Sequence, residues 1–262
     1  MTKLHQKSQN NPKLEHLDLS NNSLTGPLQL STWNHSLRRF EISSNLFSGQ
    51  LPTHLGLLIP KVEHFNISRN SFEGNLPPSM KQMKSLSWLD VSNNKFSGNV
   101  QKSMFGMSSL KFLLLANNNF SGSIGDEWKD QTSLIALDIS NNMISGKFPS
   151  WIGSSMLLLQ YVQMSRNRLN FQYKFCSLSR LILLDVSQNQ LVGGVPPTCF
   201  NSVSLVFLYV QKNGFSGPIP HVLLSEASNL KIMDLSHNNF SGHIPQWLNK
   251  FTKLAGSFVE RE

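Results

Sequence analysis

The stretch Leu86–Gly98, LSWLDVSNNKFSG, recurs in variant form ten times along this chain of 262 residues. Each copy begins with an apolar residue, has further apolar residues three and five positions later, and has an asparagine at the ninth position. Successive asparagines lie 22 to 25 residues apart, at Asn22, Asn45, Asn70, Asn94, Asn118, Asn142, Asn167, Asn189, Asn213 and Asn238. A period of this length predicts stacked structural units in one elongated domain.

The apolar pair inside each copy predicts a short strand. Leu89 and Val91 are separated by one polar residue, so their side chains point to the same face. Strands stacked at about 4.8 Å per repeat would form one parallel sheet. An apolar residue two positions after each asparagine is expected to fill the interior, at Leu24, Phe47, Phe72, Phe96, Phe120, Ile144, Leu169, Leu191, Phe215 and Phe240.

Glycine stands four positions after the asparagine in nine of the ten copies, at Gly26, Gly49, Gly74, Gly98, Gly122, Gly146, Gly193, Gly217 and Gly242. A glycine held at one phase predicts a backbone angle that a side chain would disfavour. One copy departs, because Phe171 takes the glycine position after Asn167 and the next step is the shortest. We expect a local irregularity at Asn170–Phe175, which we interpret as a shortened outer loop.

Several copies continue as G-x-[IVL]-P, as at Gly74–Pro77 and Gly242–Pro245. A 24-residue step with this ending resembles the plant-specific class of leucine-rich repeat. The phrases LDLSNNSLTGPL (17–28) and MDLSHNNFSGHIP (233–245) resemble plant receptor-like proteins and receptor kinases. This resemblance covers roughly residues 14–250.

The resemblance implies a leucine-rich repeat solenoid of the α/β type, wound as a right-handed superhelix of about ten repeats. Its parallel sheet would line the concave face, and short 3-10 or loop segments would cover the convex face. The resemblance also implies that the repeated asparagines form a ladder of hydrogen bonds to backbone groups of neighbouring turns. The physical reason is that buried N–H and C=O groups in a tight coil need partners.

Composition restricts the function further. The net charge is +8 and the pI about 9.6, but the basic residues are scattered and form no nucleic-acid-binding motif. No stretch is long and apolar enough to span a membrane. No histidine has metal-ligand spacing with a second ligand, and no catalytic constellation is recognisable. The sequence therefore predicts neither an enzyme nor a metal or cofactor site.

The ends of the chain differ from its middle. Residues 1–13 are polar, without the apolar region of a signal peptide or a cap. Residues 14–250 are the repeat domain, and residues 251–262 are expected to be the truncated start of a further repeat, with Leu254 as its leucine. We expect an internal piece of a longer receptor ectodomain, or the product of a shortened gene model. The parent family lies at the plasma membrane, facing outward, and the location of this chain is left open.

Two kinds of modification are predicted. Cys176 and Cys199 occupy nearly the same phase in successive repeats, so stacking would bring them within disulfide range, although two free thiols are the alternative. A bridge would contribute roughly 3 kcal/mol in an oxidising compartment. Glycosylation sequons occur at Asn21, Asn34, Asn66, Asn119 and Asn239.

The candidate ligand-binding residues are those that the strand pattern places on the concave face without a role in the core. The large aromatic ones are Trp88, Phe112, Tyr161, Phe207 and Tyr209. Aromatic and arginine side chains are typical interface anchors. Arg69, Arg166 and Lys212 could pair with an acidic group of a ligand. The competing interpretation is that the aromatic side chains pack laterally on neighbouring strands.

The resemblance implies a receptor-type segment that binds a peptide, an elicitor or another protein and signals through a partner kinase, in defence or development. One alternative is a secreted inhibitor similar to plant polygalacturonase-inhibiting proteins. Another is a truncated paralogue that does not signal.

Overall fold

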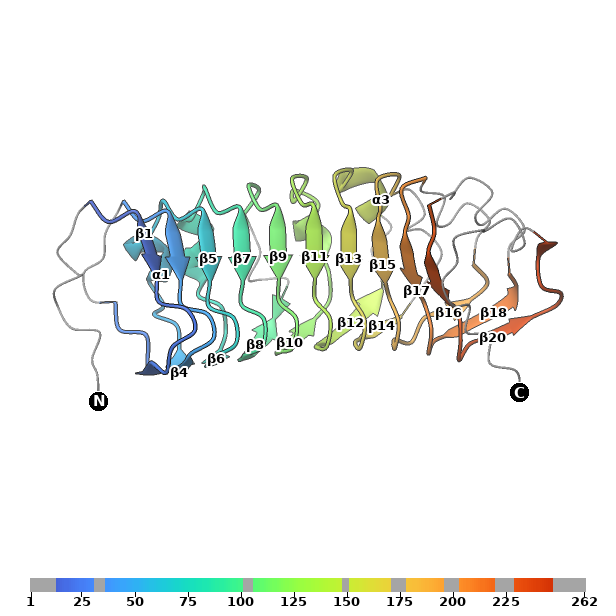
Figure 1. Cartoon of the computed structure of the whole chain (residues 1–262), viewed down its shortest axis with the longest axis horizontal. Coiled ribbons are helices and arrows are strands. Elements are labelled where there is room, and N and C mark those ends of the chain that lie inside the picture. Colours follow the sequence, from blue (N-terminus) through green and yellow to red (C-terminus); the bar gives the residue numbers. More distant parts are fainter. Residues whose placement is uncertain are drawn as a thin grey trace.

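The computed structural model describes residues 13–30, 36–100, 106–147, 151–170, 178–195, 203–219 and 229–246. In it, successive repeats stack along one axis, so that β1 (His16–Asp18) and β19 (Ile232–Asp234) lie towards opposite ends of an elongated solenoid (Figure 1). The expectations for the two chain ends, Asn34, the segment after Asn170 and the cysteine pair fall outside the described residues.

The predicted parallel sheet has ten strands in sequence order, one from each repeat. We call it the concave sheet. Each strand has three residues: β1 His16–Asp18, β3 Arg39–Glu41, β5 His64–Asn66, β7 Trp88–Asp90, β9 Phe112–Leu114, β11 Ala136–Asp138, β13 Tyr161–Gln163, β15 Leu183–Asp185, β17 Phe207–Tyr209 and β19 Ile232–Asp234. The register is constant, so Phe65 lies beside Phe40 and Leu89.

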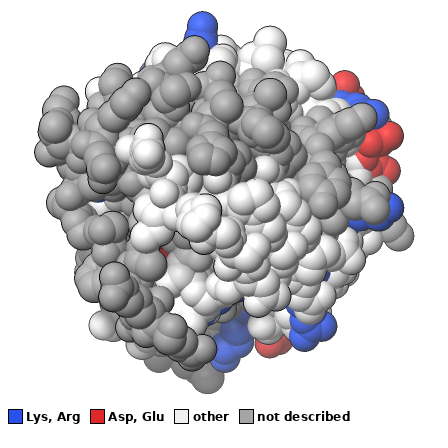
Figure 2. All heavy atoms as spheres, turned by 90° about the vertical axis from the view of Figure 1, so that its right-hand side faces the viewer, with Lys and Arg blue, Asp and Glu red and all other residues white. Residues whose placement is uncertain are grey.

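The middle residue of each strand points into the core and the two flanking residues point away from it. In β5, for example, Phe65 is fully buried while His64 and Asn66 are partly exposed. Behind the sheet, phenylalanines of successive repeats stack, with ring centroids 6.0 Å apart for Phe47 and Phe72 and 6.2 Å apart for Phe72 and Phe96. The core is therefore continuous along the solenoid. In an end-on view, the charged side chains in sight lie at the rim (Figure 2).

A second set of parallel strands, which the sequence did not predict, follows the asparagine turns. Seven strands form one sheet: β2 Thr25–Gly26, β4 Leu46–Gln50, β6 Ser71–Gly74, β8 Lys95–Asn99, β10 Asn119–Gly122, β12 Met143–Lys147 and β14 Arg168–Asn170. Three more form another: β16 Val192–Gly193, β18 Gly214–Pro218 and β20 Asn239–Ser241. The interruption falls beside the repeat that lacks the glycine, where a single bridge joins Asn170 and Gln190.

Short helices complete some repeats, as expected for the side opposite the concave sheet. They are α1 Leu55–Leu58, η1 Pro78–Gln82, η2 Asp126–Trp128 and α3 Ile152–Ser155. Figure 1 shows α1 and α3 behind the concave sheet. Their inward residues, such as Leu55 and Trp128, are fully buried, so each helix closes the core of its repeat.

The asparagine ladder is present as the resemblance implied. The Asn70 side-chain amide donates to the carbonyls of Ile67 and Ser68 in its own turn and to that of Ile42 in the preceding repeat, at 3.0–3.1 Å. Its Oδ1 accepts a hydrogen bond of 3.0 Å from the Phe47 backbone N–H. The same pattern recurs at later asparagines, including Asn94 and Asn118. From Asn45 onward, each asparagine thus joins two repeats, while Asn22 in the first repeat donates to carbonyls of its own turn.

Positive φ recurs at two positions of the repeat. The repeated glycines have a positive φ, from 77° at Gly74 to 92° at Gly193, which confirms the prediction. The residue just before each ladder asparagine also does, although none is glycine: Asn21, Ser44, Arg69, Asn93, Asn117, Asn141, Arg166, Gln188, Lys212 and His237, with φ of 51–56°. Asparagine is enriched in this region of φ/ψ space because its short side chain tolerates it.

Candidate interaction surface

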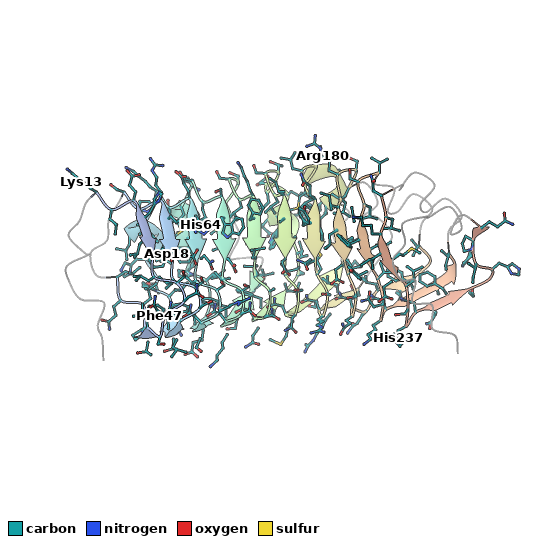
Figure 3. All side chains as sticks on the ribbon, in the orientation of Figure 1. Lys13, Asp18, Phe47, His64, Arg180 and His237 are labelled. Carbon is teal, nitrogen blue, oxygen red and sulfur yellow. The ribbon has the colours of Figure 1, made fainter. Side chains whose placement is uncertain are left out.

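The outward face of the concave sheet presents two columns of side chains, one from each end of the strands. The first column holds His16, Arg39, His64, Trp88, Phe112, Ala136, Tyr161, Leu183, Phe207 and Ile232. The second holds Asp18, Glu41, Asn66, Asp90, Leu114, Asp138, Gln163, Asp185, Tyr209 and Asp234. Figure 3 shows Asp18 and His64 on this sheet. The fixed register places each residue next to its counterparts in the adjacent repeats.

Part of the aromatic set packs laterally, as the competing interpretation expected. The Trp88 ring lies 4.5 Å from the Phe112 ring between centroids, and the His64 ring stacks on the other side of Trp88 at 5.4 Å. The three rings form a row across β5, β7 and β9. All three are partly exposed, so this row is both packed and accessible.

The remaining aromatic candidates lie farther along the same sheet. Tyr161 is 40% exposed, and its neighbours in the first column are Ala136 and Leu183. Phe207 and Tyr209 come from the two ends of β17, and both are partly exposed. These positions offer aromatic surface that the core does not use.

The cationic candidates lie at the margin of this surface. Arg69, Arg166 and Lys212 each follow a strand by three residues, in the turn where φ is positive. All three are exposed. Their backbones are fixed, because the Arg69 and Arg166 N–H groups donate to carbonyls of the following repeat at 2.9 and 3.0 Å. The structure thus places these charges beside the strands, and the aromatic side chains lie on the strands themselves.

Most carboxylates of the second column cap their own turn. Asp138 Oδ1 accepts hydrogen bonds from the Ser140 backbone N–H at 2.9 Å and from its hydroxyl at 2.7 Å. Burial raises the pKa of Asp138 above its ordinary value of 3.8, against the effect of these hydrogen bonds. At the exposed end of the column, hydrogen bonds from Ser20 lower the pKa of Asp18. These aspartates belong to the scaffold.

Glu41 differs from the other acidic residues and was not among the predicted site residues. It is only 5% exposed. Its Oε2 lies 3.2 Å from His64 Nε2 and 3.6 Å from Arg39 Nη2. Arg39 and Glu41 lie on the same strand, β3, and only the register of β3 and β5 shows that the His64 side chain converges on Glu41.

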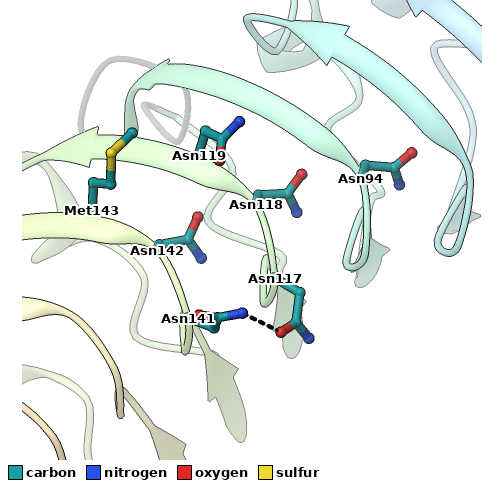
Figure 4. A pocket seen from close by; sticks show the side chains of 7 residues that line it. All are labelled: Asn94, Asn117, Asn118, Asn119, Asn141, Asn142 and Met143. Carbon is teal, nitrogen blue, oxygen red and sulfur yellow. Dashed lines mark hydrogen bonds between the residues drawn. The ribbon is translucent and has the colours of Figure 1, made fainter.

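A shallow pocket of about 380 Å³ opens at the turns after the strands, lined by Asn94, Asn117, Asn118, Asn119, Asn141, Asn142 and Met143 (Figure 4). Asn141 Nδ2 donates to Asn117 Oδ1 at 2.7 Å. The ladder residues Asn94, Asn118 and Asn142 use their amides for backbone groups. The pocket is therefore mainly a consequence of the repeat geometry.

The described sequon asparagines are accessible to different degrees. Asn21, Asn119 and Asn239 are exposed, and Asn66 is partly exposed on the concave sheet. Asn66 Oδ1 accepts a 3.0 Å hydrogen bond from the Ser68 N–H, as the aspartates of its column do in their turns. A glycan on Nδ2 would leave this bond in place.

Other kinds of site find no support in the described ranges. Among those residues, no group of three or more histidine, cysteine, aspartate or glutamate side chains could hold a metal ion. Over the same ranges, no helix has the length and apolarity needed to cross a membrane.

The comparisons with known proteins agree with this architecture. The family model described as Leucine Rich Repeat matches residues 13–34, 61–83, 85–107, 109–130, 133–155 and 229–251, just over half of the chain. The chain belongs to the leucine-rich repeat family. Within this family its sequence relatives include plant receptor-like proteins. It is 36% identical over 268 residues to Receptor-like protein 14 of Arabidopsis thaliana, which covers 92% of the chain and 27% of that protein.

Solved leucine-rich repeat structures match over nearly the same range. The chain resembles the TDR receptor with a TM-score of 0.86 and 28% identity, over 92% of the chain and 42% of that structure. The ectodomain of the Arabidopsis receptor kinase HAESA, solved with an IDA peptide hormone ligand, matches with a TM-score of 0.77 and 30% identity, over 92% and 44%. The leucine-rich repeat chain thus spans less than half the length of each of these relatives.

Proposed function

We propose that this leucine-rich repeat chain is a ligand-binding segment of a plant cell-surface receptor-like protein. A protein or peptide ligand binds to the concave sheet, on the outer side of the plasma membrane, and the signal passes to a partner kinase. The relatives support this proposal: they include receptor-like proteins by sequence, and HAESA is a receptor kinase solved with a peptide hormone.

The observation that carries the proposal is the exposure of Tyr161 near the middle of the concave sheet. A tyrosine left 40% exposed between Ala136 and Leu183 contributes little to the core. Aromatic side chains of this kind are typical anchors of protein interfaces, because they bury a large area at a small entropic cost. Arg166, in the turn after the same strand, adds a positive charge for an acidic group of the ligand.

Site-specific crosslinking tests the proposal. The full chain is secreted from plant cells with a photo-reactive amino acid in place of Tyr161, or in place of the exposed Lys81 on η1 as the control. After irradiation with apoplastic fluid, adducts are identified by mass spectrometry. We expect a defined protein or peptide adduct from position 161 and none from position 81.

Affinity measurements with the captured partner complete the test. Tyr161→Ala and Arg166→Ala should each weaken binding at least about tenfold, the effect of losing about 1.4 kcal/mol. The same partner should bind Lys81→Ala with unchanged affinity. Two results would contradict binding on the concave sheet. One is equal crosslinking from positions 161 and 81, and the other is an affinity that neither Tyr161→Ala nor Arg166→Ala changes.

A further inference from the structure

We propose that the concave sheet over β3, β5 and β7 contains a subsite for a guanidinium group, such as an arginine side chain of the ligand provides. The subsite is formed by Glu41, His64 and Trp88. This inference rests on the proposed function and assigns the chemistry of one part of the same surface. It is carried by two buried polar atoms without partners and by a local charge opposite to that of the whole chain.

The first unpaired atom is a carboxylate oxygen of Glu41. One oxygen, Oε2, lies near His64 Nε2 and Arg39 Nη2, but Oε1 has no hydrogen-bond partner among the described residues. Glu41 is 5% exposed, so bulk water does not satisfy this oxygen. A buried acceptor without a partner is costly, and native proteins rarely leave one. A ligand that donates a hydrogen bond to Oε1 would remove this cost.

The second unpaired atom is the indole N–H of Trp88, which is buried without an acceptor among the residues that the structure describes. Strands β3 and β7 are separated only by β5, so they lie about 10 Å apart at 4.8 Å per strand. One arginine residue spans this distance. Its guanidinium would donate to Glu41, and a carbonyl of its backbone would accept from Trp88.

The aromatic row offers an apolar contact beside the carboxylate. Trp88 is held between the rings of His64 and Phe112, at 5.4 and 4.5 Å, and remains partly exposed. The two neighbouring rings cover the faces of the indole, so its exposed part offers an apolar contact to the stem of an arginine side chain. The nearby side chains of His64 and Glu41 would set the direction from which the guanidinium group of the ligand approaches Trp88.

The local charge also favours a cation, although the chain as a whole carries +8. Asp18 lies beside Glu41 in the second column, and Asp90 follows one strand beyond Asn66. Arg39, at 3.6 Å from Glu41 Oε2, and Arg69, in the turn after β5, offset two of these three negative charges. The remaining negative charge would attract a basic ligand group and disfavour an acidic one.

Nuclear magnetic resonance with two matched probes tests the subsite. The full chain is labelled with nitrogen-15 and titrated with N-acetyl-arginine amide, or with N-acetyl-citrulline amide, which has nearly the same shape and no charge. The indole resonance of Trp88 is assigned by its absence in Trp88→Phe. We expect saturable shifts of this resonance with the arginine probe at millimolar concentrations, and at least fivefold smaller shifts with the citrulline probe.

Two variants separate charge from fold. Glu41→Gln keeps the shape of the side chain and removes its charge, and should weaken binding of the arginine probe at least tenfold. Glu73→Gln makes the same change of net charge on the exposed part of β6 and should leave binding unchanged. Should Glu41→Gln fail to fold, Asp18→Asn on the exposed end of the column replaces it, with an expected two- to threefold loss of affinity.

Several results would overturn the subsite. One is equal shifts with both probes, and another is an arginine titration that neither Glu41→Gln nor Asp18→Asn alters. The proposed function fails separately: if crosslinking from position 161 captures a partner while the Trp88 resonance does not move, the receptor function stands and the guanidinium subsite does not.

Discussion

Asn118 Oδ1 accepts a 2.9 Å hydrogen bond from the backbone N–H of Phe96, so a side chain of one repeat satisfies the buried backbone of the repeat before it. The Asn118 amide also donates to three carbonyls, one of them in that preceding repeat. Because the ladder asparagines from Asn45 onward join two repeats in this way, the stability of each repeat depends on the neighbouring repeats as well as on its own contacts.

Replacement of Asn118 by alanine should be strongly destabilising. It would remove the partner of one N–H and of two C=O groups, while the third C=O group, that of Ala116, keeps its hydrogen bond from the Asn93 N–H. We expect a loss of about 2–5 kcal/mol in the free energy of unfolding. Urea denaturation followed by circular dichroism measures this. Asn119→Ala, one position along and exposed, should change the stability by less than about 0.5 kcal/mol. Similar losses in the two variants would contradict the ladder.

Two glycines should respond to alanine for different reasons. Gly217 has a φ of 79° and open space around an added Cβ. Gly217→Ala should therefore lower the free energy of unfolding only because alanine disfavours the left-handed conformation, by about 1–2 kcal/mol. In Gly56→Ala the new Cβ would lie 1.9 Å from the backbone oxygen of Ser79, so α1 and η1 would have to separate. We expect a cost of about 3 kcal/mol or more. Thermal melts of the two variants rank them, and a smaller loss for Gly56→Ala would contradict the close approach.

The phenylalanines of the core and of the concave sheet should differ in their contribution to stability. Phe96 is fully buried between Phe72 and Phe120, and Phe96→Ala should cost about 3–5 kcal/mol through lost burial and a cavity. Phe112 is partly exposed against Trp88, and Phe112→Ala should cost about 1 kcal/mol. Chemical denaturation of both variants provides the comparison. Equal costs would mean that the aromatic row is part of the core.

The raised pKa of Asp138 predicts how stability changes with pH. A carboxyl group with a higher pKa in the folded state binds its proton more readily there, so its ionisation destabilises the fold. As the pH falls from neutral through the folded pKa towards 3.8, the wild-type chain should therefore gain stability relative to Asp138→Asn. The variant keeps an Oδ1 acceptor for Ser140. Urea titrations from pH 7 to pH 3.5 measure the difference, and a pH-independent difference would contradict the effect of burial.

Much of the fold followed from the sequence because every repeat carries the same local instructions. The number of regularly spaced asparagines predicted the number of strands in the concave sheet. The alternation of apolar residues such as Leu89 and Val91 predicted which face of each strand is buried. The glycines at positive φ were also predictable, since one residue type held at one phase indicates one backbone requirement. These features depend on residues close together in the chain, and stacking only repeats them.

Other features were decided by tertiary structure. The second sheet was missed because its strands, such as Lys95–Asn99, contain glycine and show no clear apolar alternation. The contact of Trp88 with Phe112 and the burial of Glu41 against His64 join residues more than 20 positions apart. The sequence by itself determined which positions face outward, because a short strand alternates strictly. Only the register between repeats decided which outward side chains meet, because lateral contacts depend on the neighbours that stacking supplies.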